Sequence, residues 1–206
     1  MKVLIGQKLG MLQQLREDGA AWGVTAVEVW PATVTRLRTA TKDGYAAMQV
    51  GAGEKRRGTK GDKGQGNGKA YTFLGEFPLA SEAVKAGDTL GIDQVAAGES
   101  LQISATSKGK GFQGTIKRHN FSRGPMTHGS RNQRRPGSIG GVDAARVFPG
   151  QKMPGRMGHD KVTLRNVKVA AVHTEENVIL LKGAVPGPTG AIVTLISNEP
   201  AQVAAA

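Results

Sequence analysis

Most of the net positive charge of this chain is confined to one segment rich in glycine and proline. Residues 105–165 hold 13 Lys or Arg and only two acidic residues, whereas the rest of the chain carries 15 basic and 14 acidic side chains. The segment has no continuous apolar face and contains four prolines, so it cannot bury enough surface to fold by itself. We expect a polyanion, most simply a nucleic acid, to order it through charge neutralisation and counterion release.

The composition of the chain favours some classes of protein and excludes several kinds of site. The chain has 206 residues, a formal charge of +12 and a pI near 10.2, which favour attraction to polyanions. It has no cysteine, which excludes disulfides, thiolate metal sites and cysteine nucleophiles. Residues 1–15 are interrupted by polar side chains, and no run approaches the roughly 18 apolar residues of a membrane span. We therefore expect a soluble, cytoplasmic protein that contacts no membrane.

The near-neutral remainder has the pattern of a β-protein. Residues 22–30 and 33–39 are rich in β-branched and aromatic side chains, and Pro31 between them predicts a hairpin. Further strands are predicted at residues 45–50, 101–106, 162–172, 177–182 and 191–196. Short antiparallel strands at this spacing predict a mainly β fold with a closed barrel of about six strands, which leaves no exposed edge.

Two segments between the predicted strands differ from this pattern. Residues 79–85 could form a short helix with Ser81 as its N-cap. Residues 51–69 contain seven glycines and six basic residues but no large apolar side chain. They are interpreted either as a flexible solvated loop or as a second loop that contacts RNA.

The sequence contains motifs that occur in enzymes and cofactor sites, but the residues around them do not fit these functions. Residues 109–114 match GxGxxG, but a dinucleotide site requires a helix and an acidic residue about 20 positions later, where this chain has Gln133, Arg134 and Arg135. The histidines are isolated from one another and from carboxylates, which gives a zinc site no support. No nucleophile-elbow pattern accompanies the serines. We expect no enzymatic activity, no metal site, no cofactor and no small-molecule substrate.

The basic segment itself supplies the candidate binding residues. Its charges lack the opposite-sign partners of a solvated helix face, and Arg outnumbers Lys, which favours bidentate phosphate contacts and stacking on bases. Phe112, Phe121 and Phe148 interleave with the cations and can either stack on unpaired bases or anchor the segment on the barrel. The predicted RNA-binding residues are Lys108, Lys110, Lys117, Arg118, Arg123, His128, Arg131, Arg134, Arg135, Ser138, Arg146, Lys152 and Arg156.

Duplex DNA is the main competing ligand. Proteins that read duplex DNA generally present a rigid helix or ribbon to a groove, and the basic segment has no amphipathic helix to present. A thin glycine-rich strand is better suited to thread between the helices of a folded RNA. RNA is therefore the preferred ligand, an architectural DNA-binding protein is the alternative, and an enzyme built on a β-barrel is a third reading.

Several blocks of the sequence, in the same order, resemble the bacterial large-subunit ribosomal protein L3 family. They extend over almost the whole chain. The blocks are residues 6–11 (GQKLGM), 106–114 (TSKGKGFQG), Lys117-Arg118 with Phe121, 127–130 (THGS), 136–140 (PGSIG), 150–153 (GQKM), 155–158 (GRMG) and 181–187 (LKGAVPG).

This resemblance implies a six-stranded closed antiparallel barrel of the translation-protein type, a small α+β insertion after its third strand and a long irregular basic extension. It also implies a non-catalytic constituent of the large ribosomal subunit that binds large-subunit rRNA, especially its three-prime domain, beside neighbouring ribosomal proteins. Family members promote early subunit assembly, and the tip of the extension, residues 138–154 here, would point toward the peptidyl-transferase centre. Any Mg²⁺ would be held by the rRNA.

Mapped onto this chain, the family's organisation divides it into five parts. The barrel begins in residues 1–50, the glycine-rich loop and the insertion occupy residues 51–100, and residues 101–120 hold a barrel strand and the start of the basic segment. The RNA-threading loop spans residues 121–160, and residues 161–206 complete the barrel. Some bacterial members carry a methylated glutamine after the PGSIG block, but this chain has residues 141–145 (GVDAA) there. We therefore do not predict that modification.

Overall fold

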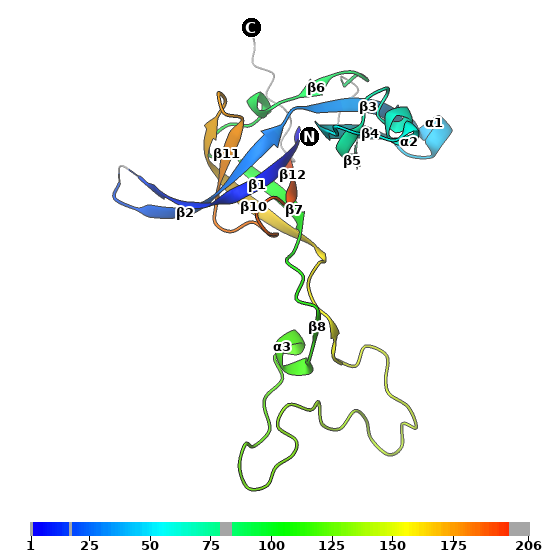
Figure 1. Cartoon of the computed structure of the whole chain (residues 1–206), viewed down its shortest axis with the longest axis vertical. Coiled ribbons are helices and arrows are strands. Elements are labelled where there is room, and N and C mark those ends of the chain that lie inside the picture. The colour runs from blue at the N-terminus through cyan, green and yellow to red at the C-terminus, as the bar shows by residue number, and fades with distance from the viewer. Residues whose placement is uncertain (1, 17, 79–83, 198–206) are drawn as a thin grey trace. The chain divides into compact units, whose positions relative to one another are not determined.

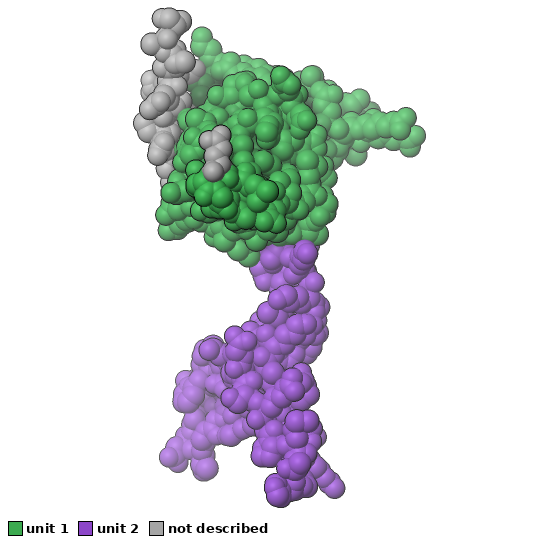
Figure 2. All heavy atoms as spheres, turned by 90° about the vertical axis from the view of Figure 1, so that its left-hand side faces the viewer, with its two compact units in different colours: residues 1–106, 161–206 green, residues 107–160 purple. Residues whose placement is uncertain are grey.

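The computed structural model of the chain describes residues 2–16, 18–78 and 84–197 and is mainly β, which confirms the predicted fold class (Figure 1). The chain divides into two compact units, which Figure 2 distinguishes by colour. The first, called the body here, comprises Met1–Thr106 and Lys161–Ala206, and the second, called the extension, is Ser107–Asp160. Among the described residues, no helix has the length and apolar character needed to cross a membrane.

The body is built around a ring of antiparallel strands. The strand order is β1-β12-β7-β10-β11-β2, and the ring closes because β2 also pairs with β1. The strands of the ring are β1 (Lys2–Leu15), β2 (Ala21–Trp30), β7 (Ser100–Thr106), β10 (Lys161–His173), β11 (Val178–Lys182) and β12 (Ile192–Ser197).

Apolar side chains from every strand of this ring meet in one core cluster. In β7, Leu101, Ile103 and Ala105 alternate along the strand and all three are buried in the cluster. Ile179 and Leu195 join them from β11 and β12 and are almost inaccessible to solvent. Burial of each such aliphatic side chain stabilises the fold by about 1.5–3 kcal/mol, so the alternation in the sequence determines which face of each strand points inward.

A second sheet is inserted between β2 and β7 in the sequence and is called the inserted sheet. Its order is β5-β4-β3-β6, with β3 at Ala32–Arg38, β4 at Ala47–Glu54, β5 at Tyr71–Pro78 and β6 at Thr89–Leu90. Val34, Val50 and Phe77 form its apolar face, which packs in one cluster with Val3 and Ile5 of β1. The described residues of the insertion also form two short helices, α1 (Ala40–Asp43) and α2 (Lys60–Gln65), and a 3₁₀ helix at Ile92–Gln94.

The later strands of the sequence prediction are confirmed, but the predicted hairpin around Pro31 is wrong. β2 pairs with β1 and β11, whereas β3 pairs with β4 and β6, so the chain passes from the ring into the inserted sheet at Pro31. The fixed φ of proline suits an extended connection as well as a turn, and the local pattern does not distinguish them. The strand predicted at residues 45–50 is β4 and also belongs to the inserted sheet.

The sequence analysis assigned no strand to the amino terminus, although Lys2–Leu15 forms β1. It also expected residues 51–69 to form a loop, whereas β4 continues to Glu54 and α2 follows. A reciprocal capping box, in which the Thr59 side chain accepts from the Asp62 amide and the Asp62 side chain from the Thr59 amide, stabilises the start of α2. The helix predicted at residues 79–85 falls mostly on residues 79–83, which lie outside the described residues.

The extension contains little regular structure. Its elements are β8 (Phe112–Gln113), α3 (Thr115–His119) and β9 (Gly155–Arg156), and β8 pairs with β9. Figure 1 shows the long irregular loop that connects α3 to β9.

Candidate RNA-binding surface

The two ends of the extension run beside each other and form a neck. Ser107 and Asp160 exchange hydrogen bonds, the Ser107 amide donating to the Asp160 carbonyl at 2.9 Å and the Asp160 amide to the Ser107 hydroxyl at 3.2 Å. Further along, the Lys110 amide donates to the Met157 carbonyl at 2.9 Å and the Met157 amide to the Gly111 carbonyl at 3.0 Å. This ladder holds both strands of the neck in register up to the β8–β9 pair.

Beyond the neck, α3 is tied to the returning strand through the carbonyl of Met153. The Arg118 guanidinium donates to this carbonyl at 2.9 Å, and His119 Nε2 lies 3.0 Å from it. Asn120 ends α3 with a left-handed backbone at φ 58°, a conformation that Asn tolerates better than most residues. The neck, α3 and Met153 therefore form the ordered base from which the loop begins.

The loop between Phe121 and Lys152 makes few contacts with itself. The Gly124 amide donates to the Gln133 carbonyl at 3.0 Å, and the Ser138 hydroxyl donates to the Gly140 carbonyl at 2.9 Å. Within the described extension only Thr115 is buried, so the loop has no apolar core. Internal packing therefore contributes little to its shape, and the ordering of the loop by a partner stays a prediction.

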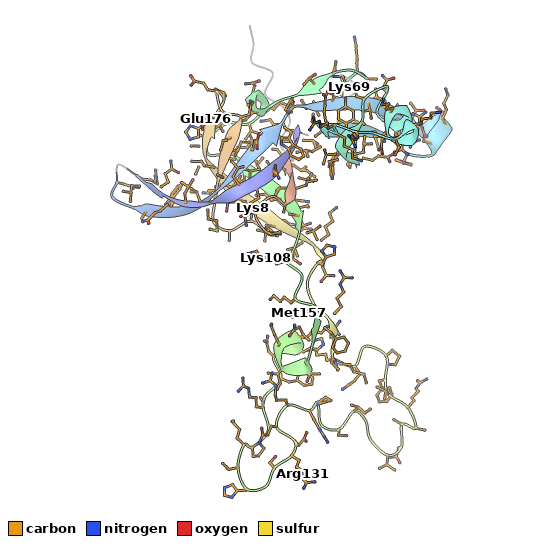
Figure 3. The ribbon with its side chains drawn as sticks, in the orientation of Figure 1. Lys8, Lys69, Lys108, Arg131, Met157 and Glu176 are labelled. Carbon is orange, nitrogen blue, oxygen red and sulfur yellow. The ribbon has the colours of Figure 1, made fainter. Side chains whose placement is uncertain are left out.

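The structure spreads the predicted RNA-binding residues along the whole extension instead of gathering them at one point (Figure 3). All thirteen of them are exposed. Lys108 and Lys110 lie on the neck, Lys117 and Arg118 on α3, and Arg156 on β9. The remainder lie on the loop: Arg123, His128, Arg131, Arg134, Arg135, Ser138, Arg146 and Lys152.

The cations of the extension are not neutralised within the protein. Every ion pair found among the described residues joins side chains of the body. The extension has eleven Lys or Arg but only two acidic residues, Asp143 and Asp160. Mutual repulsion along an exposed chain of this kind is relieved when a polyanion replaces solvent and counterions.

The extension also carries exposed aromatic rings. Phe112 is 76% exposed and Phe148 is 56% exposed, whereas His119 and Phe121 form a tilted ring pair with centroids 6.1 Å apart. Exposed phenylalanine next to arginine is the combination that stacks on unpaired RNA bases.

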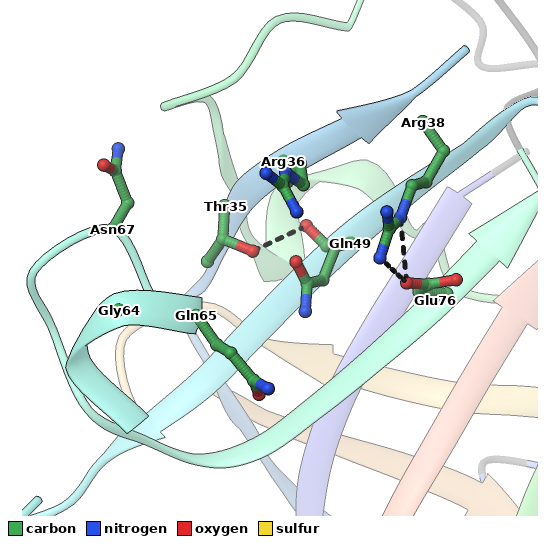
Figure 4. Close-up of a pocket in the computed structure, with 8 residues that line it drawn as sticks. All are labelled: Thr35, Arg36, Arg38, Gln49, Gly64, Gln65, Asn67 and Glu76. Carbon is green, nitrogen blue, oxygen red and sulfur yellow. Dashed lines mark hydrogen bonds and ion pairs between the residues drawn. The ribbon is translucent and has the colours of Figure 1, made fainter. Parts of the chain in front are cut away.

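The body carries a polar pocket that the sequence analysis did not anticipate. It lies on the inserted sheet, has a volume of about 480 Å³ and is lined by Thr35, Arg36, Arg38, Gln49, Gly64, Gln65, Asn67 and Glu76 (Figure 4). These residues share no motif: the pairing of β3, β4 and β5 brings the strand residues together, and α2 with the loop after it adds the other three. Among the described residues, no group of His, Asp and Glu has the arrangement of a metal site.

Hydrogen bonds set the protonation of two carboxylates that contact Arg38 of this pocket. The hydrogen bond from Arg38 and the one from the Thr39 amide hold the pKa of Asp43 below its ordinary value. The Tyr45 hydroxyl and Arg38 do the same for the pKa of Glu76. Both carboxylates are therefore ionised at neutral pH and fix the orientation of Arg38.

Comparison with known proteins agrees with the resemblance that the sequence blocks suggested. The family model described as ribosomal protein L3 matches residues 65–177. The large ribosomal subunit protein uL3 of Heliobacterium modesticaldum is 43% identical over 203 residues, which cover 96% of this chain and 97% of that relative. A match that includes both the ring strands and the exposed basic extension shows that the chain belongs to the ribosomal protein L3 family.

Proposed function

We propose that the chain binds large-subunit rRNA directly through its extension, promotes an early step of subunit assembly and directs the tip of its loop, residues 138–154, toward the peptidyl-transferase centre. Membership of the ribosomal protein L3 family makes it a structural constituent of the large subunit in the cytoplasmic ribosome and not an enzyme. The proposal adds direct contact with RNA, and in particular with the three-prime domain.

One observation carries this proposal. The extension exposes eleven cations without a single acidic partner in ion-pair range among the described residues, on a backbone with no apolar core. Such a segment gains little free energy from folding alone and much from neutralising closely spaced phosphates. Exposed Phe112 and Phe148 add a stacking surface that duplex DNA, with its bases paired and stacked, does not use.

The remaining parts of the proposal concern the body and its surroundings. We propose that the ring of strands is a barrel of the translation-protein type and that it lies beside neighbouring ribosomal proteins. The protein requires no cofactor of its own in this scheme, since Mg²⁺ ions would be held by the rRNA. The extension supplies the cations at places where RNA helices crowd together.

A competition experiment tests RNA against the DNA-binding alternative. The full chain is bound to a labelled transcript of the three-prime domain of large-subunit rRNA, and unlabelled transcript or random duplex DNA of equal phosphate content is added at several KCl concentrations. We expect the transcript to compete at least about 100-fold better, because specific nucleic-acid complexes exceed non-specific ones by this margin or more. Equal competition by duplex DNA would contradict the proposal and favour an architectural DNA-binding protein.

A further inference from the structure

One wall of the pocket on the inserted sheet is a row of polar side chains that crosses three strands. Arg36 on β3 lies opposite Gln49 on β4, and Gln49 lies opposite Glu76 on β5. A bulge at Thr35 shifts the register of β3, so that Val34 stays buried while Arg36 is exposed on the other side. The Thr35 hydroxyl donates to the Gln49 carbonyl at 3.3 Å, which ties the bulge to the central strand.

The segment that contains α2 forms one side of this pocket (Figure 4). Tyr71 packs between this segment and β4, because a Cβ at Gly66, the residue that ends α2, would lie 3.0 Å from its ring and a Cβ at Gly51 would lie 2.5 Å from it. Gly51 is therefore required where the ring meets the strand. Gln65, the last residue of α2, and Asn67, two residues later, line the pocket together with Gln49 and contribute two further amide groups.

The two arginines of the pocket have different roles. Arg38 is held by Asp43, whose carboxylate is 2.6 Å away, and by Glu76 at 3.1 Å. The Arg36 side chain is exposed and makes no hydrogen bond or ion pair among the described residues. Arg38 is thus a fixed part of the wall, whereas Arg36 remains available to an anion at the rim.

The lining determines which ligands can bind. It contains no aromatic and no aliphatic side chain apart from the methyl group of Thr35, so an apolar ligand would gain little from entering. Three side-chain amides each present both donors and acceptors, as the edge of a nucleobase does. One free guanidinium suits one phosphate, and 480 Å³ is within the range of pockets that hold a molecule of nucleotide size.

We propose that this pocket binds a single unpaired nucleotide of RNA, with its phosphate on Arg36 and its base edge on the amides of Gln49 and Gln65. This inference rests on the proposed binding to rRNA but concerns a separate surface, on the body instead of the extension. It would add recognition of a particular unstacked base to the largely sequence-independent attraction of the extension. A free nucleotide offers the same chemistry, and the test separates the two sources.

Two substitutions test the pocket in the full chain. Gln65→Ala removes an exposed amide, and its matched control Gln13→Ala removes an exposed amide from β1. Arg36→Gln removes the free cation, and its matched control Lys168→Gln removes an exposed cation from β10. All four positions are exposed or lie at the surface of the sheet, so thermal unfolding should be unchanged and binding can be compared directly.

The probe is the transcript of the three-prime domain, titrated at several KCl concentrations. We expect Gln65→Ala to weaken binding about 5- to 50-fold without changing the salt slope, because an amide contacts no phosphate charge. Arg36→Gln should weaken binding and also reduce the salt slope by about one. In dimethyl sulfate or kethoxal probing, one base whose pairing edge the wild-type chain protects should become reactive in the Gln65→Ala complex, and neither control should have this effect.

The other outcomes distinguish failure of the proposed RNA binding from failure of the pocket inference alone. If the wild-type chain does not bind the transcript at all, the proposed function fails together with this inference. If it binds and both pocket variants match it in affinity, slope and base protection, only the pocket inference is overturned. Adenosine or guanosine monophosphate is titrated separately, and tight binding of either one, with RNA binding unaffected by the variants, would show a free-nucleotide site and overturn the inference as well.

Discussion

Replacing the loop of the extension by a short Gly-Ser linker should remove a calculable part of the salt dependence of RNA binding. The replacement covers residues 123–152 and ends before Met153, whose carbonyl accepts the hydrogen bond from Arg118. It removes six of the eleven cations of the extension, namely Arg123, Arg131, Arg134, Arg135, Arg146 and Lys152. The β8–β9 pair, α3 and the core of the body all lie outside the replaced residues.

The magnitude follows from the number of cations removed. Each phosphate contact contributes about 0.7 to 0.9 to the slope of log affinity against log salt, so six lost contacts should lower the slope by about 4 to 5. Between 50 and 200 mM KCl the wild-type chain should therefore lose about 2.5 to 3 more powers of ten in affinity than the variant. Fluorescence anisotropy with the labelled three-prime transcript measures both slopes.

The control is a chain in which residues 123–152 are shuffled with their composition kept. It should retain most of the slope but bind the transcript less tightly, because shuffling displaces the cations relative to the glycines that let the backbone approach RNA. An identical slope for the linker variant and the wild type would refute the argument that these side chains neutralise phosphates. Thermal unfolding of the body should be the same in all three proteins, since none of its core cluster is altered.

Three further predictions concern stability. Ile103→Ala removes a fully buried side chain from the core cluster of the ring and should lower the free energy of unfolding by about 3 to 4 kcal/mol in urea titrations, and a loss below about 1 kcal/mol would contradict the assigned core. Lys2→Met breaks the ion pair of Lys2 and Glu99, whose side chains are 11% and 6% exposed, and should cost about 2 to 3 kcal/mol at neutral pH. Burial would raise the pKa of Glu99, but hydrogen bonds from Ser197 and Lys2 lower this pKa overall. The pair therefore stabilises the fold at pH values above the ordinary pKa of Glu, and the difference in stability between variant and wild type should vanish as acid protonates Glu99. A difference that does not depend on pH would contradict this. Gly158→Ala places a Cβ against the Lys108 carbonyl at a backbone φ of +73°, and should accelerate hydrogen exchange of the Lys110 and Met157 amides while the unfolding of the body is unchanged.

Local sequence patterns were sufficient to predict the strands in which apolar and polar residues alternate clearly. Residues 101–106 and 191–196 were predicted within one residue of β7 and β12, because alternating burial leaves a period of two in the sequence. The start of the chain was missed because the burial of β1 does not alternate: residues 3–6 are all buried, and beyond Lys8 the strand is mostly exposed and no longer pairs with β12. The hairpin at Pro31 failed because strand partners are chosen by distant residues, here β11 for β2 and β6 for β3.

The sequence alone determined the location of the charge, the absence of a fold of its own in the extension and the family. These properties depend on composition and on local order: cations without acidic neighbours and glycines without apolar residues cannot form a core in any arrangement. The tertiary structure decided which strands close the ring and which form the inserted sheet. It also created the pocket, because Arg36, Gln49 and Glu76 become neighbours only through the register of three paired strands, and register results from burying the opposite face of the sheet.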